Sequence, residues 1–294
     1  MSNILLPPGF CDLTGASAKK HFFILKYCIE HFNNAGYELV LPSLFEYNIA
    51  DKDEDHIKVV DPINNQVMAM RNDITAQISR IWHREGSKTP QKFCYYGDVI
   101  YRQKKGTDRS RKMTQTGIEY IVDDNLDRDI EILKIVLQIL SGLKLNDFSI
   151  LISCPNLFNS YCKLFNITKQ NRLELEGYLI DKNITAIKES EYSDLAQFII
   201  PGSFSLQDIK IKHLEQEVES IQILTRSLKE TYPGINIIID PFDIKQYSYH
   251  TDFVFSVISH KLKKTIARGG SYNISDTQSA VGSSFYIEEL SLAI

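Results

Sequence analysis

Apolar residues recur at helical spacing near the start of the chain. They are Phe22, Leu25, Ile29 and Phe32. Because positions three or four apart lie on one face of a helix, the pattern predicts an amphipathic helix that packs one side on a core. Ser17 is suited to the N-cap of this helix, and the Asn-Asn-Ala-Gly run at residues 33–36 supplies its end.

Strand-like segments follow this helix. Residues 37–47 are largely apolar but contain Pro42. Since proline has no backbone N–H to donate to a neighbouring strand, this strand should lie at a sheet edge or be interrupted. Two further strands are predicted at residues 66–70 and 93–102, and a helix-like run at residues 75–83 separates them.

The middle of the chain is predicted to be mainly helical. A helix is expected at about residues 127–140, because acidic residues gather in its first turns, where the helix dipole favours negative charge. A buried strand is expected next, at residues 148–152. The pattern between about residues 155 and 201 is short, polar and helical, and we interpret it as an inserted helical module.

The last third of the chain combines one helix with several strands. Residues 214–228 present one apolar face of a helix that Pro233 and Gly234 end. The apolar run at residues 235–239 suits a strand that is covered on both faces. Strand-like segments follow at residues 247–259, 265–267 and 279–287, before a final short helix. Helices followed by a strand-rich end predict an α+β fold with a mostly antiparallel sheet.

Composition narrows the class of protein. A chain of 294 residues with 43% hydrophobic content can bury one substantial core. The formal net charge of -4 argues against nucleic-acid or anionic-membrane binding driven by overall charge, which needs an excess of Lys and Arg. The five cysteines include no C-x-x-C pair, which is typical of reduced thiols in a cytoplasmic protein. The pattern suggests no membrane span, metal site or cofactor.

Four short clusters hold residue types that binding and catalysis use, and each also has a structural explanation. A strand that ends in Arg102, a basic loop, and a returning strand with Gln115 and Glu119 can hold an anionic and a polar group. By composition alone, a solvated hairpin loop explains this cluster better. Asp73 and Thr75 lie where a strand passes into a helix, and either residue type belongs at an N-cap without any ligand.

The other two clusters lie near the end of the chain. Residues 245–251 alternate aromatic and polar side chains, which suits either a cleft or a half-exposed strand. His250 is a possible titrating group there, although a lone histidine is more often packed or hydrogen-bonded. Residues 268–272 contain the pair Gly269 and Gly270, which permits either a close backbone approach or a plain hairpin turn.

The order and spacing of these segments resemble the catalytic domain of class II histidyl-tRNA synthetases. The matching segments are residues 6–13, 36–46 (motif 1), 71–76, 96–102 with 115–119 (motif 2), and 268–272 with 280–282 (motif 3). The resemblance implies a class II synthetase-like antiparallel sheet flanked by helices. It also implies one such domain over residues 1–294, with the small helical insertion at about 155–201. Because the chain ends soon after motif 3, we expect no anticodon-binding domain.

Departures from the synthetase pattern indicate the function. The motif 3 arginine that binds the terminal phosphate of ATP is replaced by Glu289, which reverses the charge facing a triphosphate. The motif 2 acid is missing, with Lys104 in its place. The histidine-specific segment is also altered, with Lys245 at the family's arginine position and Asp252 at a glycine position. Adenylate-forming chemistry therefore loses its main electrostatic support.

The resemblance is closer to regulatory subunits of ATP phosphoribosyltransferase than to active synthetases. It implies a non-catalytic protein of histidine biosynthesis that supports a short-form catalytic subunit and conveys feedback inhibition by histidine. A homodimer through motif 1 within a hetero-octamer is implied as well. The positions that match the histidine-holding residues of synthetases are Asp73, Thr75, Arg102, Gln115 and Glu119, with Tyr249 and His250 nearby.

Two other functions remain open at the sequence level. One is an active ligase that forms an aminoacyl-adenylate, which amino-acid-dependent exchange between pyrophosphate and ATP would reveal. The other is a tRNA-binding or nutrient-sensing relative of the synthetases, for which the basic loop from Arg102 to Lys112 is the supporting feature. Loss of tRNA binding on changing Arg109 and Arg111 would identify that function.

Overall fold

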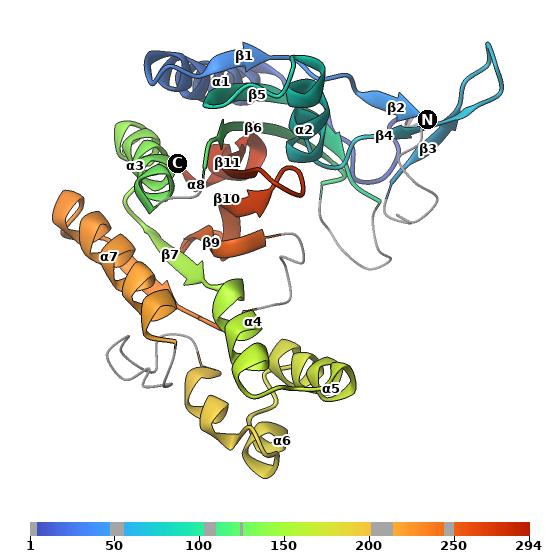
Figure 1. Cartoon of the computed structure of the whole chain (residues 1–294). Coiled ribbons are helices and arrows are strands. Elements are labelled where there is room, and N and C mark those ends of the chain that lie inside the picture. The colour runs from blue at the N-terminus through green and yellow to red at the C-terminus, as the bar shows by residue number, and fades with distance from the viewer. Residues whose placement is uncertain (1–4, 48–55, 103–109, 124–125, 201–213, 244–249) are drawn as a thin grey trace.

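An eight-stranded sheet forms the centre of the computed structural model, which describes residues 5–47, 56–102, 110–123, 126–200, 214–243 and 250–294, without the side chains of residues 250–252 (Figure 1). The strand order is β1-β5-β6-β11-β10-β9-β7-β8. The strands are β1 (Glu38–Val40), β5 (Gln91–Ile100), β6 (Lys112–Ile121), β7 (Phe148–Ser153), β8 (Asn236–Ile239), β9 (His250–Ser259), β10 (Lys264–Asn273) and β11 (Ser279–Tyr286). The pairs β1–β5 and β7–β8 are parallel, whereas the other neighbours run antiparallel. The predicted α+β fold is confirmed.

A small second sheet extends from one end of the molecule (Figure 1). Its order is β2-β4-β3, with β2 at Phe45–Tyr47, β3 at Lys58–Val60 and β4 at Val67–Met70. Pro42 separates β1 from β2, so the two halves of the predicted strand enter different sheets. Both expectations for this segment are confirmed, because the strand is interrupted and β1 is an edge strand.

Helices cover the two faces of the large sheet unequally. The helices of the synthetase-like core are α1 (Gly15–Asn34), α2 (Thr75–Arg84), α3 (Leu126–Gly142), α7 (Glu215–Thr231) and α8 (Ile287–Ala293). Successive strand residues point to opposite faces. Along β5, Cys94 belongs to the apolar cluster that includes α1, α3 and α8, whereas Phe93 and Tyr95 belong to the cluster of α2. The α2 face leaves room for a cavity beside that helix.

Four short helices occupy the span in which helical structure was predicted. They are α4 (Pro155–Leu164), α5 (Lys169–Ile180), α6 (Ile184–Glu189) and the 3-10 helix η1 (Ser193–Phe198). Thr168 and Asn183 cap α5 and α6 through their side-chain oxygens. Lys182, between these two helices, forms a 2.6 Å ion pair with Asp240, which follows β8. This pair joins the helical segment to the edge of the large sheet.

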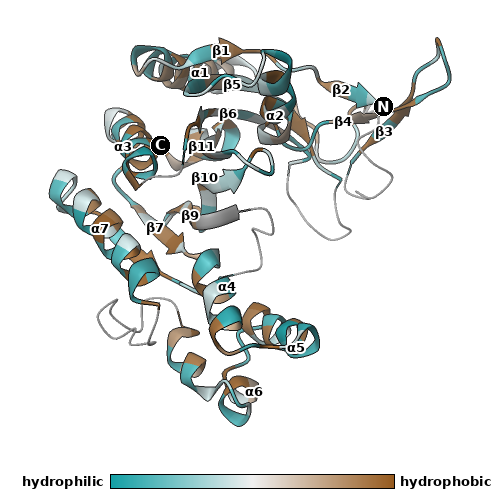
Figure 2. Cartoon of the chain, in the orientation of Figure 1, coloured by the Kyte–Doolittle hydropathy of each residue, from teal (hydrophilic) through white to brown (hydrophobic). Residues whose placement is uncertain are grey.

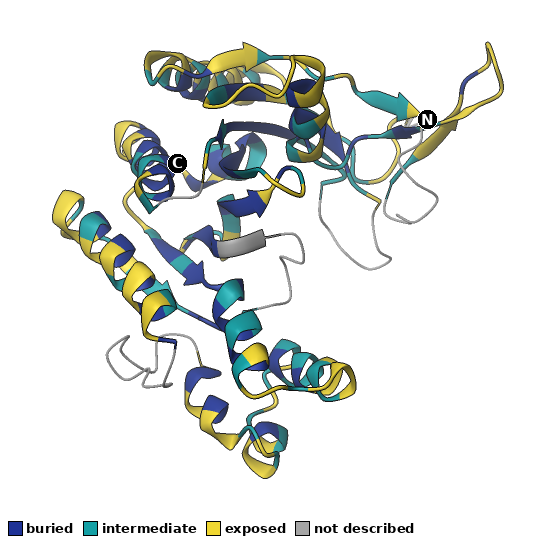
Figure 3. Cartoon of the chain, viewed as in Figure 1, coloured by how far each residue is buried: buried dark blue, intermediate teal, exposed yellow. Residues whose placement is uncertain are grey.

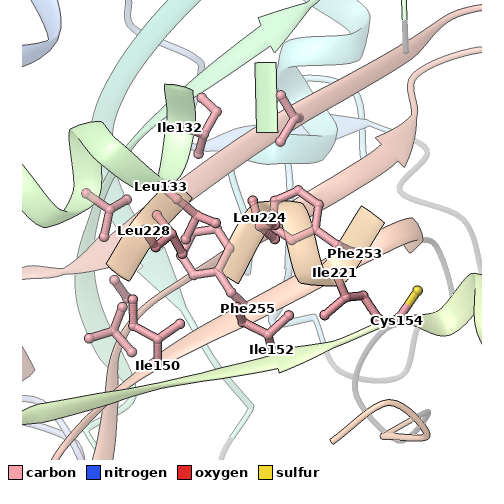
Figure 4. Close-up of a cluster of buried hydrophobic side chains, with 14 of the residues drawn as sticks. Ile132, Leu133, Ile150, Ile152, Cys154, Ile221, Leu224, Leu228, Phe253 and Phe255 are labelled. Atoms are coloured by element: carbon pink, nitrogen blue, oxygen red, sulfur yellow. The ribbon is translucent and has the colours of Figure 1, made fainter. Parts of the chain in front are cut away.

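The larger of the two apolar clusters includes the contact between the sheet and helices α3 and α7. Figure 4 shows Leu133 of α3 and Leu228 of α7 pointing toward Ile150 and Phe255 of the sheet. Figure 2 shows apolar residues concentrated on the strands, and Figure 3 shows the same strands buried. The outer surfaces of α5 and α7 are polar and exposed, as expected for helices with one face on the core.

Three local predictions were wrong. The first helix begins at Gly15 after the N-cap Thr14, so Ser17 lies within the helix and does not cap it. Strand β8 is only partly buried, because it is an edge strand with a neighbour on one side. The third strand of the tail extends well beyond residues 265–267, because β10 continues through Gly269 and Gly270 to Asn273. The paired glycines therefore lie in a strand and not in a hairpin turn.

Candidate ligand-binding site

A cavity of about 290 Å³ lies on the α2 face of the large sheet. Its polar lining comes from the start of α2 and from β6, β10 and β11. The principal side chains are Asp73, Thr75, Gln115, Glu119, Arg268 and Tyr272. Four of the predicted site residues therefore meet, although they come from two separate segments of the chain. They are Asp73, Thr75, Gln115 and Glu119. The volume is near the lower limit for small-molecule sites.

Glu119 is the buried acid at the base of this cavity. It is 1% exposed, and hydroxyl groups surround its carboxyl. Thr75 Oγ1 donates to Oε1 at 2.9 Å, and the Tyr272 hydroxyl donates to Oε2 at 2.9 Å. The Tyr95 hydroxyl adds a 3.3 Å contact to Oε1. These donors fix the orientation of the carboxyl before any ligand arrives.

Burial raises the pKa of Glu119 to about 8. Hydrogen bonds from Thr75 and Tyr272 lower the pKa, and the negative charge of Asp73 raises it further. Without a ligand, the carboxyl is therefore mostly protonated at neutral pH. A cationic group placed in the cavity would favour the ionised form, so a cationic ligand would displace a proton from Glu119.

The stability of the protein should depend on pH through Glu119. Its folded pKa of about 8 exceeds the unfolded value near 4.5, so the folded state binds the extra proton between these values. Stability should fall as pH rises through this window, by at most about 1.4 kcal/mol per pH unit. Glu119→Gln mimics the protonated carboxyl and should raise the melting temperature at pH 8 far more than at pH 5. An equal rise in melting temperature at both pH values would contradict the assignment of a proton to Glu119 in the folded state.

Gln115 is held as firmly as Glu119. Its Nε2 donates to Asp73 Oδ1 at 2.8 Å and to Ser284 Oγ at 2.7 Å. Its Oε1 accepts a hydrogen bond from the backbone N–H of Ile74 at 3.1 Å. Asp73 Oδ1 also accepts the backbone N–H of Thr75 at 3.3 Å, one residue after the N-cap Ile74. The start of α2 and strand β6 are therefore locked together around the cavity.

Glycine at position 282 allows the carboxyl of Glu119 to lie against β11. A Cβ atom there would lie 1.8 Å from Glu119 Oε2, far closer than atoms approach. Gly117 on β6 leaves room for the backbone of β11, because a Cβ there would lie 2.3 Å from the carbonyl oxygen of Ser283. The cavity floor thus depends on the absence of two side chains.

Gly282→Ala should displace Glu119 and remove ligand binding at this cavity. The added methyl group overpacks a buried site, which typically costs about 1–3 kcal/mol of stability. Thermal unfolding would measure the loss of stability, and calorimetric titration would measure the affinity for the ligand. Gly177→Ala is the matched control, because a Cβ on this helical glycine meets nothing within 4 Å. If Gly282→Ala left the ligand affinity unchanged, Glu119 would not be the carboxyl that binds the ligand.

Arg268 brings positive charge to the cavity. Its guanidinium carbon lies 5.2 Å from the ring centroid of Tyr286, and both residues line the cavity. Asp73 and Glu119 contribute the acidic groups of the same space. Acidic and cationic groups together suit a ligand that carries both an ammonium and a carboxylate, such as an amino acid. Arg268 and Tyr272 had been assigned only to a glycine-rich segment and not to the site.

The other predicted site residues fall into two groups. Arg102 follows β5, is exposed and is absent from the cavity lining, so its contact with a carboxylate stays a prediction. Lys104, Lys245 and Tyr249 lie outside the described residues. His250 and Asp252 belong to β9, but their side chains also lie outside the described part of the structure.

Glu289 lies on α8 and is absent from the cavity lining. Its Oε1 forms an ion pair with Lys264 Nζ at 3.0 Å, so it is tied to strand β10. The adjacent Glu288 accepts the backbone N–H of Thr114 at 2.7 Å. Burial raises the pKa of Glu288, but His21 and the Thr114 N–H outweigh burial and lower it overall. The start of α8 is therefore acidic, which disfavours a phosphate group there.

A Ser-His-Asp chain of hydrogen bonds lies elsewhere on the sheet and was not predicted. His260 Nε2 lies 2.6 Å from Ser149 Oγ, and His260 Nδ1 lies 2.6 Å from Asp147 Oδ1. This order of groups is that of serine hydrolases. Ser149 is buried, however, and its Oγ also accepts a 2.6 Å hydrogen bond from Asn236. The cluster therefore stabilises the packing of β7 against β8 and the end of β9.

Comparison with known proteins identifies the family of this chain. The family model for histidyl-tRNA synthetase matches residues 9–290. The chain belongs to the histidyl-tRNA synthetase family. The cavity is built from the segments that resemble its motifs 2 and 3 and from the matching segment at residues 71–76. Strands β1 and β2 carry the segment that resembles motif 1. The class II synthetase-like fold is thus confirmed.

Within this family, the chain is similar to regulatory proteins. It is 27% identical to the ATP phosphoribosyltransferase regulatory subunit of Thiobacillus denitrificans over 93% of this chain and 91% of that protein. The crystal structure of an ATP phosphoribosyltransferase regulatory subunit/histidyl-tRNA synthetase from Bacillus halodurans matches with a TM-score of 0.83 and 20% identity. That match covers 99% of this chain and 83% of the other.

An assembled relative has the same fold. A chain of the ATP phosphoribosyl transferase (HisG:HisZ) complex from Thermotoga maritima matches with a TM-score of 0.75 and 18% identity. The match covers 91% of this chain and 97% of that one. Among the described residues of the present chain, no helix has both the length and the apolar character that a membrane span needs.

Proposed function

We propose that this protein is a regulatory subunit of ATP phosphoribosyltransferase, the first enzyme of histidine biosynthesis. It supports a short-form catalytic subunit in the cytoplasm and performs no chemistry itself. The similarity to a relative of that name over nine-tenths of both chains supports the assignment. The likeness to a chain of the HisG:HisZ complex is consistent with a catalytic partner.

The single observation that carries the proposal is the different fate of the two ends of the synthetase site. At the amino-acid end, Asp73, Thr75 and Glu119 line a preformed cavity. At the phosphate end, Glu289 occupies the arginine position and pairs with Lys264. A carboxylate repels a triphosphate instead of stabilising it. Such a protein recognises an amino acid without activating it.

Histidine is the proposed ligand of the cavity. Glu119 binds the cationic imidazole or ammonium group, and Gln115 and Asp73 bind its remaining donors. Arg268, already inside the cavity, neutralises the carboxylate together with Arg102. Tyr249 and His250 complete the site by family resemblance. In the assembly, occupancy by histidine lowers the activity of the catalytic partner, which is a coupling free energy of about 1–3 kcal/mol in typical systems.

A homodimer through the motif 1 region is the proposed scaffold of a hetero-octamer. Strand β1 is an edge strand of the large sheet, and Leu39 on this strand and Leu41 directly after it are exposed. Val60 and Val67 of the small sheet are exposed as well. Exposed apolar side chains in one region favour burial against another chain.

Reconstitution tests the proposal directly. The short catalytic subunit alone should form little phosphoribosyl-ATP, and addition of this protein should raise the rate. Histidine should then inhibit the complex. A catalytic subunit that is equally active without this protein would refute the regulatory role.

Pyrophosphate exchange separates this function from that of an active ligase. The isolated protein should show no histidine-dependent exchange between pyrophosphate and ATP, because by family resemblance Glu289 replaces the arginine that binds the terminal phosphate of ATP. Exchange at rates typical of synthetases would mean that the ligase assignment is correct and the regulatory one wrong.

A further inference from the structure

A second cavity, of about 300 Å³, lies between α3, α4, α7 and β9. Its apolar floor is formed by Ile221, Leu224 and Phe253, which lie together in Figure 4. Its polar wall includes Asp129, Asn156, Gln216, Glu217 and Ser220. The cavity is as large as the first one and combines an apolar surface with a few polar groups, as small-molecule sites do.

The charges around this cavity favour a cation. Asp129 and Glu217 contribute two carboxylates, and the described lining includes no Lys, Arg or His. Arg128 Nε lies 3.4 Å from Asp129 Oδ1 and balances part of that charge, although Arg128 does not line the cavity. Within the described part of the chain, no cationic side chain forms an ion pair with Glu217. An anionic ligand would be repelled by both carboxylates.

The second cavity lies behind the first one across the sheet. Ser271 Oγ donates a 3.1 Å hydrogen bond to Asp129 Oδ1, which lines the second cavity. The neighbours of Ser271, Gly270 and Tyr272, line the first cavity, because successive strand residues point to opposite faces. Tyr272 in turn donates to Glu119. Three residues of β10 therefore connect the two cavities.

We propose that the second cavity binds a small organic ammonium compound with an apolar body, and that its occupancy alters the first cavity through Ser271 and β10. The ammonium group pairs with Glu217 and Asp129. The apolar body lies on Leu224 and Phe253. A ligand that draws Asp129 toward itself changes the hydrogen bond to Ser271, and the strand transmits this change to Tyr272 and the Glu119 carboxyl.

Titration of the isolated chain with 2-phenylethylamine, followed by amide NMR, tests the site. We expect saturable shifts at Glu217 and Leu224, and further shifts at Gly270 and Tyr272. Glu217→Gln should weaken binding at least fivefold. Glu219→Gln is the matched control on the same helix, because Glu219 is exposed and does not line the cavity, and it should leave the affinity unchanged. The neutral 2-phenylethanol should bind at least tenfold more weakly.

The outcomes are distinct. Absence of saturable binding would overturn the site, as would equal effects of the two glutamate substitutions or equal affinity for the alcohol. Ser271→Ala should keep the shifts at Glu217 and remove those at Tyr272. Persistent shifts at Tyr272 in this variant would overturn the proposed connection. Neither measurement needs a partner subunit, so failure of the regulatory proposal leaves this test intact.

Discussion

Glu119→Gln is expected to weaken histidine binding by roughly ten- to a hundredfold and to abolish feedback inhibition. A hydrogen bond to a charged group contributes about 1.5–3 kcal/mol, and the glutamine retains the shape of the side chain while losing the charge. Glu119 is buried and its carboxyl is held by Thr75 and Tyr272, so the glutamine should occupy the same place without the charge. The variant should still fold, since glutamine imitates the protonated carboxyl.

Calorimetric titration with histidine and inhibition of the reconstituted complex would check this result. Glu38→Gln is a suitable control, because Glu38 is exposed on β1 and far from the cavity lining. Basal activity in the complex should survive Glu119→Gln, because the proposed function assigns the chemistry to the catalytic partner. If wild-type affinity remained after the substitution, the effector would have to bind elsewhere, such as at the interface with the catalytic subunit.

The sequence predicted the elements well where the signal is local. Helical periodicity located α2, α3 and α7, and the breaks at Pro42 and Pro233 marked ends that the structure shows. These signals arise within one turn or one strand, so a single segment is sufficient to read them. The missed cap at Ser17 differs, because several residues near a helix start can cap it and packing decides which one does.

Long-range contacts explain what the sequence did not predict. Gly269 and Gly270 suited a turn, yet they lie in β10, where a Cβ on Gly269 would lie 2.2 Å from the carbonyl oxygen of Gly282. This close approach exists only after β10 and β11 have paired. The donor from Tyr272 to Glu119 likewise spans 153 positions. Family resemblance brought Asp73, Thr75, Gln115 and Glu119 together, but it gave no indication of Tyr272.

The full set of residues that line the cavity could also not be predicted from the sequence. Arg268 belonged to a glycine-rich segment, and its position beside Tyr286 follows from the pairing of β10 with β11. Its charge changes the interpretation of the site, because the acidic residues alone suit a simple cation. With Arg268 present, the cavity suits a zwitterion. The proposed contact of Arg102 with the ligand stays a prediction, and Arg268 adds a second cationic group on the cavity lining.

Arg71→Met should lower the free energy of unfolding by about 2–6 kcal/mol, because each of two buried acceptors that loses its donor costs about 1–3 kcal/mol. Arg71 is 6% exposed, and burial lowers its pKa. Its Nε donates to the carbonyl oxygen of Asp98 at 2.8 Å, and its Nη1 donates to that of Pro42 at 2.7 Å. Methionine retains much of the apolar stem but leaves both carbonyl oxygens without this donor.

The loss should also reach the proposed dimer surface. Arg71 connects the segment between β1 and β2 to β5, and Gly97 leaves room for it, since a Cβ there would lie 1.9 Å from Nη2. Denaturant unfolding would measure the loss of stability, and the mass of the protein in solution would show whether the dimer is lost. Arg80→Met is the matched control, because Arg80 is half exposed in its pair with Glu46 and should cost about 0–1 kcal/mol. Equal losses in the two variants would show that Arg71 acts as an ordinary surface charge and does not anchor this segment.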